Sequence, residues 1–378
     1  MSNVVIAGYA RSAFTLANKG ALRKTRPDDM AGAVIKGLVE KLKVNPDYIE
    51  DLLMGCAFPE GEQGLNIGRN VVFIAGLPTS VAGVTVNRFC GSSMQTIHQA
   101  AGAIKMGAGE VFMCAGIESM SRVTMGGFNP MPNPGLVNAG VQAYIGMGET
   151  AENLAEKYQI SRAKQEAFAV ESHRRAAKAQ ADGKFKDEII PVKGDGGMID
   201  ADGCIRADTT LEALAGLKPA FKDTGSVTAG TSSPLTDGAS AVLVCSEDYA
   251  KKNGLKPLAR ILAISVAGCA PEIMGIGPVP AVKKALSRAG LKLDQIDIIE
   301  LNEAFAAQAL SVVQDLGIDL AKTNIDGGAI AIGHPLGASG GRITGKAASL
   351  LQREKKKYAL ASMCIGGGQG VATVLEAM

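Results

Sequence analysis

The feature that most constrains the fold of this chain is an internal repeat. A helical pattern leads through a short turn into a strand-like apolar run at Ile49, and the same succession recurs at Ile296, an offset of 247. Phe112 in a later strand-like run corresponds to Leu360 at an offset of 248. Self-similarity at a fixed offset predicts two halves built on one structural plan. The repeated runs are 30–42, 49–54 and 110–115 in the first half and 279–289, 296–301 and 358–363 in the second.

Each half also carries a strand, a turn rich in glycine or serine, and an amphipathic helix. In the first half these are Val84–Val86 and the helical pattern Gly91–Met106; in the second they are Ile330–Ile332 and Gly337–Gln352. Strands that alternate with helices of this length are typical of βαβ units. We therefore predict an α/β fold with a mostly parallel sheet in each half and right-handed crossover connections.

The segment between the halves differs from both in composition. Residues 120–236 are richer in glycine, proline, asparagine and charge, and they contain an amphipathic helical pattern over 150–184. The stretch 194–203 is dense in glycine and aspartate, which predicts an exposed hairpin tip. A chain of 378 residues also exceeds what one hydrophobic core usually supports. We predict three parts, listed in chain order: an N-terminal half over 1–119, an inserted loop domain over 120–236, and a C-terminal half over 237–378.

Charge and hydrophobicity exclude several classes of protein. Lys and Arg number 39 against 37 Asp and Glu, and the longest basic run is Lys355–Lys357, so no nucleic-acid partner is expected. Hydrophobic residues make up 47% of the chain, as in ordinary globular proteins. No apolar run approaches the roughly 20 residues that span a bilayer, and the strand-like run Val4–Ala7 lacks a signal-peptide layout. We expect a cytoplasmic protein with a small-molecule partner and no membrane attachment.

Cysteine and histidine usage narrows the chemistry further. The cysteines are odd in number, scattered, and never spaced C-x-x-C, which argues against a disulfide framework and a zinc site. Three histidines, His98, His173 and His334, are too few for a histidine-based metal cluster. We predict no metal site, and a catalytic role for one or more of the cysteines is compatible with this pattern. The seven cysteines are Cys56, Cys90, Cys114, Cys204, Cys245, Cys269 and Cys364.

Cys90 occupies a position suited to a nucleophile. It lies between the apolar strand that ends at Val86 and the helical pattern that starts at Gly91. The small residues Gly91–Ser93 allow a sharp turn and leave free N–H groups at the helix start, where the helix dipole favours a thiolate. A buried structural cysteine is the alternative interpretation.

Two further turns hold groups that could act with a thiol. His334 lies in a glycine-dense turn before Pro335, which biases its backbone toward an extended conformation. Histidine can activate a thiol by taking its proton. Cys364 opens the run Cys364–Gly370, whose four glycines expose N–H groups that suit an oxyanion. Tight packing around a buried cysteine is the other explanation for this glycine run.

Asn302 and a possible phosphate-binding loop each have a structural explanation. Asn302 stands where a strand-like run gives way to a helical pattern, and on its own it is best interpreted as an N-cap. Gly340–Lys346 matches G-x-x-x-x-G-K, but Ala347 follows where that motif needs a hydroxyl, so an ATPase is rejected. No G-x-G-x-x-G follows a strand, so a dinucleotide-binding fold is unsupported.

Taken in order, four blocks of the sequence resemble the signature blocks of the thiolase family. They are Asn87–Ser93, Asn302–Ala306, Gly327–Gly337 and Cys364–Gly370, and the resemblance spans essentially the whole chain. It implies two similar halves in a five-layered α/β/α/β/α core with an inserted, coenzyme A-binding loop domain, assembled as a dimer or a tetramer. It also implies acyl transfer between coenzyme A thioesters, with CoA and acyl-CoA as substrates and no permanently bound cofactor.

The resemblance implies roles for five residues. Cys90 is the nucleophile that becomes acylated, His334 takes its proton, and Cys364 moves the proton at the α-carbon of acetyl-CoA. His334 and a water held by Asn302 form one oxyanion site, for the enolate. The N–H groups of Cys90 and Gly366 form a second, for the tetrahedral intermediate. A thiolate suits this chemistry because it both attacks a thioester and leaves.

The same resemblance implies how the substrate is held. Arg206, Ala229 and Ser233 match positions that contact coenzyme A, and Met147 with Met274 matches residues that line the acyl pocket. The stretch around 191–206 is shorter than in the family pattern, which affects the contacts expected for the adenine end of coenzyme A.

Two departures bear on the reaction. Gly146 stands where short-chain biosynthetic thiolases often carry a histidine, and Cys90 is followed by Gly-Ser-Ser as in many degradative enzymes. We therefore expect thiolytic cleavage of 3-ketoacyl-CoA, with acetyl-CoA C-acetyltransferase activity as the alternative. The fatty-acid condensing enzymes pair one cysteine with His and Asn or with two His, so Cys364 argues against them. A non-catalytic lipid carrier is disfavoured because Cys90, His334 and Cys364 are all intact.

Overall fold

The two halves predicted from the repeat are present in the computed structural model, which describes residues 3–378. The strand order is β3, β5, β8, β1 in the first half and β10, β11, β12, β9 in the second. Corresponding strands therefore hold the same place in each half, which confirms the shared plan. The strands are β1 (Val4–Arg11), β3 (Asp51–Gly55), β5 (Val111–Ser119), β8 (Thr236–Ser246), β9 (Ala259–Gly268), β10 (Ile298–Leu301), β11 (Tyr358–Ile365) and β12 (Gln369–Ala377).

The two half-sheets join into one ten-stranded sheet through a short contact. β1 and β9 pair antiparallel only at Val5 with Arg260 and at Ile6 with Ala259. Two more strands complete the first half: β4 (Ala82–Val86) extends the outer edge beside β3, and β2 (Thr15–Leu16) pairs with β8. The contact between the halves is thus carried mainly by the helices packed between them.

Most strand pairs are antiparallel, so the predicted mostly parallel sheet is wrong. Among the strands of residues 3–378, only β3–β4, β3–β5 and β10–β11 pair in parallel. β11 and β12 are joined by a turn over 366–368, and a connection that short can join only antiparallel strands. Gly367 and Gly368 in this turn have φ of 78° and 84°, and a side chain at Gly368 would lie 2.3 Å from the carbonyl oxygen of Cys269. The turn therefore requires glycine.

The predicted strand over Ile330–Ile332 is also wrong. Residues Ala329–Ile332 form α11, a single helical turn that ends at Gly333, where φ is 110°. A short apolar run does not distinguish a buried strand from a buried helical turn, because periodicity needs more residues than this. As a result, β4 has no counterpart strand in the second half.

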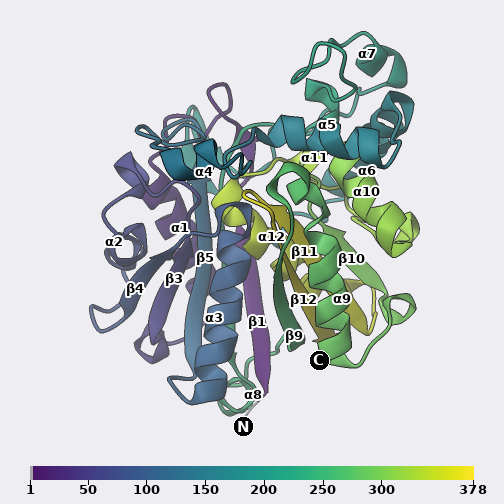
Figure 1. The fold of residues 1–378 in the computed structure, drawn as a ribbon. Helices are drawn as coiled ribbons and strands as arrows, with labels where there is room; N and C mark the ends of the chain where they lie inside the picture. The colour runs from purple at the N-terminus through teal and green to yellow at the C-terminus, as the bar shows by residue number, and fades with distance from the viewer. Residues whose placement is uncertain (1–2) are drawn as a thin grey trace.

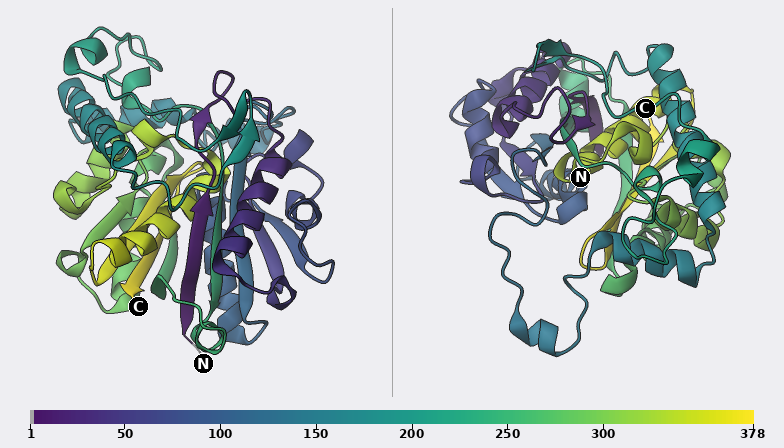
Figure 2. Two further views of the ribbon diagram at one scale, coloured as in Figure 1. Left: turned by 180° about the vertical axis from the view of Figure 1, so that it is seen from behind. Right: turned by 90° about the horizontal axis from the view of Figure 1, so that it is seen from above.

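Helices form three layers around the half-sheets, which confirms the five-layered α/β/α/β/α arrangement (Figures 1 and 2). The middle-layer helix α12 contacts strands of both halves, including β5 and β11. The helices are α1 (Pro27–Leu42) and α2 (Ile67–Ile74) on the outer face of the first half, α3 (Ser92–Met106) and α12 (Leu336–Arg353) in the middle, and α9 (Pro278–Ala289) and α10 (Ala306–Leu316) on the outer face of the second half.

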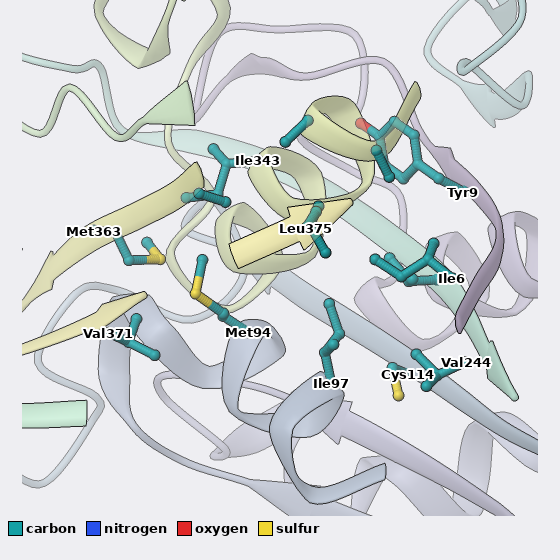
Figure 3. Packing of buried hydrophobic residues seen from close by; sticks show 14 of the residues in the cluster. Ile6, Tyr9, Met94, Ile97, Cys114, Val244, Ile343, Met363, Val371 and Leu375 are labelled. Carbon is teal, nitrogen blue, oxygen red and sulfur yellow. The ribbon is translucent and has the colours of Figure 1, made fainter. Parts of the chain in front are cut away.

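The hydrophobic core between the half-sheets fixes the two middle helices. Figure 3 shows Met94 and Ile97 of α3 and Ile343 of α12 meeting Val244 of β8 and Met363 of β11. All five side chains are fully buried, and burial of a side chain of this size contributes about 1.5–3 kcal/mol. The core therefore holds the starts of α3 and α12, next to which Cys90 and His334 lie.

The segment between the halves contains four helices and a hairpin. The helical pattern predicted over 150–184 is divided into two helices, because Gln159 adopts a left-handed φ of 52° and the side chain of Ser161 caps the second helix. The helices are α4 (Pro134–Asn138), α5 (Met147–Lys157), α6 (Arg162–Ala181) and α7 (Leu211–Ala215), and the hairpin is β6 (Val192–Gly194) with β7 (Gly197–Ile199). The hairpin lies where the glycine-rich stretch predicted one, and the chain around α4 extends away from the rest of the molecule (Figure 2).

β8 modifies the predicted division of the chain. That division begins the C-terminal half at residue 237, yet β8 lies between β1 and β5 in the first half-sheet and is followed by the short helix α8 (Glu247–Lys252). The chain therefore returns to the first half after the inserted segment. Within residues 3–378, no helix is both long enough and apolar enough to cross a membrane.

Candidate active site

Cys90 lies in a tight turn between β4 and α3. The turn is a 3-10 helix over Phe89–Gly91, and Phe89 has a left-handed φ of 41°. Ser92 holds the turn, because its Oγ accepts the N–H of Arg88 (2.9 Å) and donates to the carbonyl oxygen of Phe89 (2.6 Å). A non-glycine residue in this backbone region is strained, and such strain is common beside reactive groups. The predicted position of Cys90 at a helix start is confirmed.

The Cys90 thiol is neutral at rest. Burial raises its pKa to about 12, although the N–H groups of Gly366 and of Cys90 itself hydrogen-bond to the sulfur and lower the pKa. The two N–H groups expected to form an oxyanion site therefore both face the sulfur. A thiol with so high a pKa needs a base to become a nucleophile.

His334 is held in one orientation between α11 and α12, not at the strand-to-helix junction predicted for it. Its backbone N–H donates to Thr236 Oγ1 (3.0 Å), and its Nδ1 lies 2.5 Å from Ser339 Oγ. The Ser339 hydroxyl donates to the carbonyl oxygen of Pro335 (3.1 Å), so it accepts from Nδ1–H. Nε2 accepts from the side-chain amide of Asn302 at 3.3 Å. This network assigns the proton to Nδ1 and leaves a lone pair on Nε2.

His334 is a neutral base in this setting. Burial, followed by the nearby Arg342 guanidinium, lowers its pKa from 6.5 to about 3. The imidazole therefore carries no charge near neutral pH. A neutral imidazole whose Nε2 is unprotonated can take the proton of a neutral thiol once Nε2 is released from the Asn302 amide.

Asn302 is not an N-cap. The helix that follows, α10, begins at Ala306 with Phe305 at its N-cap position. Asn302 is fully buried, and its backbone N–H donates to the carbonyl oxygen of Ser362 at 3.0 Å, which extends the β10–β11 ladder. Its Oδ1 has no hydrogen-bond partner among the described residues. A buried polar atom of this kind needs a ligand or a water as partner.

Cys364 lies near the end of β11 and is almost fully buried. Burial raises its pKa well above the ordinary value, and the neighbouring Cys90 raises it further. Met147 and Met274 pack in the same apolar cluster as Cys364, with Phe305 and Val227. The two methionines expected at the acyl pocket therefore lie beside the second thiol. All seven cysteines are free.

The three positions expected to contact coenzyme A are placed differently. Ser233 is half-buried, and its Oγ donates to the carbonyl oxygen of Ala304 at 3.0 Å, two residues from Asn302. Ala229 and Arg206 are exposed, and the backbone N–H of Arg206 donates to Nδ1 of the buried His173 (3.1 Å). Ser233 thus lies close to Asn302 of the candidate site, while Ala229 and Arg206 are exposed.

Two site residues escaped the sequence analysis. Ser339 orients His334 but looks like one more small residue in a glycine-rich helix. Glu118 is fully buried in β5 and accepts N–H groups from Ala57 (2.8 Å) and Gly337 (2.9 Å), which joins the two halves beside His334. Burial raises the pKa of Glu118. The signal available for Glu118 was a charged residue directly after the apolar run Val111–Ile117.

Comparison with known proteins identifies the family. The model described as "Thiolase, N-terminal domain" matches residues 4–248, and "Thiolase, C-terminal domain" matches 255–377. The chain belongs to the thiolase family. The N-terminal match runs through the inserted segment and includes β8, in agreement with the sheet order.

Several named thiolases are similar to the chain along its whole length. A 3-ketoacyl-CoA thiolase of Pseudoalteromonas translucida is 48% identical over 100% of this chain and 99% of its own. A 3-ketoacyl-CoA thiolase of Bacillus subtilis is 45% identical over 100% of both chains. The crystal structure of human mitochondrial 3-ketoacyl-CoA thiolase in complex with CoA superposes with a TM-score of 0.92 at 38% identity, covering 100% of this chain and 98% of that one.

Within this thiolase fold, the cluster combines three chemical capabilities. Cys90 can attack a carbonyl once His334 holds its proton. Two N–H groups at the sulfur can receive a developing oxyanion. Cys364 is a second thiol, near Cys90, that can donate or accept a proton. This combination suits acyl transfer with carbon–carbon bond cleavage or formation.

Proposed function

We propose that this chain is an acyltransferase that cleaves 3-ketoacyl-CoA with CoA, giving acetyl-CoA and a shortened acyl-CoA. The observation that carries the proposal is the proximity of two buried thiols, Cys90 and Cys364, in a fold that also buries an imidazole whose Nε2 faces the Asn302 amide. The activity named for the relatives supports it. No permanently bound cofactor is needed, because every step uses a side chain or a substrate thiol.

In the first step, His334 Nε2 takes the proton from Cys90 Sγ as the sulfur attacks the C3 carbonyl of the substrate. The carbonyl oxygen becomes an oxyanion beside the N–H groups of Cys90 and Gly366, where two donors stabilise it. Collapse of this intermediate breaks the C2–C3 bond, leaves the acyl group on Cys90, and releases acetyl-CoA as its enolate.

In the second step, Cys364 gives its proton to C2 of the enolate, while His334 N–H and a water oriented by Asn302 hold the enolate oxygen. The Cys364 thiolate then takes the proton of an incoming CoA thiol. The CoA sulfur attacks the acyl thioester, and the released Cys90 thiolate regains its proton from His334. All protons return to their starting atoms, so the cycle closes.

Thiolysis measured across 3-ketoacyl-CoA chain lengths tests the proposal. We expect turnover with acyl chains longer than four carbons, an acyl mass on the Cys90 peptide, and loss of both in Cys90→Ala. Activity confined to the four-carbon substrate would assign the chain to acetoacetyl-CoA thiolysis, the alternative predicted from the sequence. Unchanged turnover in Cys90→Ala would overturn the acyl-enzyme route.

Substrate binding is assigned to five residues. We place the coenzyme A moiety against Ser233, Ala229 and Arg206, and the acyl chain against Met147 and Met274. The exposure of Arg206 supports a role with an anionic, solvent-facing part of the substrate. Arg206→Ala should raise KM for CoA more than it lowers kcat, and an unchanged KM would remove Arg206 from this set.

We also propose a homo-oligomer that works in the cytoplasm. β4 leaves one edge of the sheet unpaired, and the exposed side chains of Val84, Phe73 and Ile74 lie on or beside that edge. An exposed apolar sheet edge favours pairing with another chain. The seven free thiols support a reducing compartment. Light scattering on the wild type and on Val84→Lys tests the assembly, and a monomeric wild type would refute it.

A further inference from the structure

A buried ion pair joins two of the elements that carry the candidate active site, β10 and α12. Arg342 of α12 donates from Nη1 to Glu300 Oε2 of β10 at 3.2 Å, and both side chains are almost fully buried. None of the steps proposed above uses either residue. Two buried charges are expensive to desolvate, so their retention requires an explanation beyond stability.

The pair and the catalytic groups share two elements. Glu300 and Asn302 are two residues apart along β10 and its extension, so their side chains lie on the same face of the sheet. His334 and Arg342 lie just before and within α12. Two interactions therefore connect the α12 region with β10 and its extension: the Glu300–Arg342 ion pair and the hydrogen bond between Asn302 and His334.

The pair also sits in a cluster of polar atoms with unused bonding capacity. Glu300 Oε1, Arg342 Nε and the Tyr9 hydroxyl are buried and have no hydrogen-bond partner among residues 3–378. The Tyr9 ring packs against Gly345 of α12, one turn beyond Arg342, and the charge of Arg342 acts on the Tyr9 hydroxyl. The pair is thus held in place by packing, while its charges are only partly compensated by hydrogen bonds.

Charge balance at Arg342 bears directly on the base. The Arg342 cation opposes the formation of an imidazolium at His334. The Glu300 carboxylate contacts Arg342. When Glu300 is ionised, its negative charge offsets the effect of the Arg342 cation on His334, and when Glu300 is protonated this compensation is lost.

We propose that Glu300 is a positioning residue that acts through Arg342: the ion pair fixes α12 against β10 and sets how readily His334 accepts the proton of Cys90. This inference rests on the proposed role of His334 as the base. It assigns the pair a function in the acylation step that packing alone would not require.

A pH dependence follows from this arrangement. Burial raises the pKa of Glu300 to about 7; Arg342 and Lys346 of α12 lower it, while Asp326 and Glu188 raise it. Above that pH the carboxylate is ionised, Arg342 is compensated, and proton transfer from Cys90 to His334 is easier. Acylation of Cys90 by acyl-CoA should therefore step upward, several-fold, as pH rises through about 7.

The test uses Glu300→Gln, Arg342→Met and the charge-balanced double variant of the full chain. Acylation and iodoacetamide alkylation of Cys90 are followed across pH by peptide mass spectrometry. Glu300→Gln should remain at the low-pH rate, and Arg342→Met should alkylate at or above the high-pH rate. The double variant should show no rate increase near pH 7, and its rate should lie between those of the two single variants.

Opposite signs in the two single variants are the decisive result. A purely structural pair would slow Cys90 in both variants, and that outcome would overturn the proposal. Arg260→Met is the matched control, because it removes a half-buried cation from Glu376 and Glu247 in another part of the fold; it should leave the pH step in place. Should Glu300→Gln not fold, Arg342→Met and the double variant still report the sign. Failure of wild-type Cys90 to acylate would refute the proposed function instead.

Discussion

Removing the Ser339 hydroxyl isolates the orientation of the base from every other property of the site. Ser339 is almost fully buried, its hydroxyl accepts Nδ1–H of His334 at 2.5 Å, and the same hydroxyl donates to the carbonyl oxygen of Pro335. Ser339→Ala deletes one oxygen atom and removes the acceptor of the His334 Nδ1–H. The imidazole then loses the partner that keeps its proton on Nδ1, and the tautomer with the proton on Nε2, which cannot accept a second one, gains population.

The size of the effect follows from the cost of an unsatisfied buried donor. That cost is about 1–3 kcal/mol, and each 1.36 kcal/mol on the barrier changes the rate tenfold. Acylation of Cys90 should therefore slow by about 5- to 150-fold. Binding of acyl-CoA should change little, because Ser339 lies behind the imidazole and away from the exposed positions assigned to coenzyme A.

The assay is single-turnover acylation of Cys90 in the absence of an acyl acceptor, read by intact mass. Thr344→Val provides the matched control: Thr344 is a fully buried hydroxyl residue on the same helix, and its Oγ1 donates to the carbonyl oxygen of Gly340 at 2.8 Å without touching His334. Its acylation rate should stay within about twofold of wild type. Equal rates in Ser339→Ala and Thr344→Val would refute the orientation argument.

Three further predictions address other members of the site. Cys364→Ala should still take an acyl group onto Cys90 but fail at thiolysis of 3-ketoacyl-CoA, and loss of acylation equal to that in Cys90→Ala would contradict this separation. Asn302→Asp should slow the carbon–carbon step by about 10²- to 10³-fold, because a carboxylate replaces a donor beside the enolate; since Asn302 caps no helix, unchanged turnover would remove it from catalysis. Because burial raises the pKa of Glu300 from 4.5 to about 7, the protonated side chain contributes stability that is fully present below pH 4.5 and is lost as pH rises through about 7, an effect on the order of 3 kcal/mol. Chemical denaturation across pH should show this loss in wild type and not in Glu300→Gln.

The two-half architecture could be predicted from the sequence because the repeat relates residues that are far apart along the chain. The offset between Ile49 and Ile296 survives as corresponding strands in the two half-sheets. Cys90 was recognisable because a thiol between a strand and a helix, flanked by small residues, needs no tertiary information to be identified. Its environment was predicted only through the family resemblance, because one of the N–H groups at its sulfur comes from Gly366, far along the chain, and no local pattern links the two residues.

The errors arose where tertiary contacts override local signals. Asn302 matched an N-cap, yet the ladder to Ser362 draws its backbone into the strand and delays the helix to Ala306. Ile330–Ile332 matched a strand, but neighbouring glycines permit a single buried helical turn instead. β8 followed a long insertion and so appeared to open the second half, whereas its pairing partners β1 and β5 belong to the first.

The repeat also explains where the site lies. The backbone N–H of Gly341 donates to Ser93 Oγ at 2.7 Å, and these residues are 248 positions apart, the same offset that relates Phe112 to Leu360. Equivalent positions of α3 and α12 therefore touch each other at the junction of the halves. The middle helix of each half begins near this junction, and the residues just before the two helices differ. Cys90 precedes α3, and His334 precedes α12.

This contact between equivalent helices predicts a sensitive position. A side chain at Gly340 would place Cβ 2.4 Å from the backbone nitrogen of Met94, so Gly340→Ala must push α12 away from α3. Overpacking of this kind costs about 1–3 kcal/mol of unfolding free energy, and it should also separate Cys90 from His334 and slow acylation.

Gly102 of α3 supplies the opposite case. No atom lies within 4 Å of a Cβ built there, and the residue is exposed on a helix, so Gly102→Ala should stabilise the protein by about 0.5–1 kcal/mol through helix propensity alone. Acylation should stay at the wild-type rate, because the contact with α12 is untouched. Thermal denaturation and single-turnover acylation of both variants measure the two effects together. If Gly340→Ala acylated normally, the spacing of the two helix starts would not govern proton transfer between the thiol and the imidazole, and the site would owe its geometry to the surrounding turns instead.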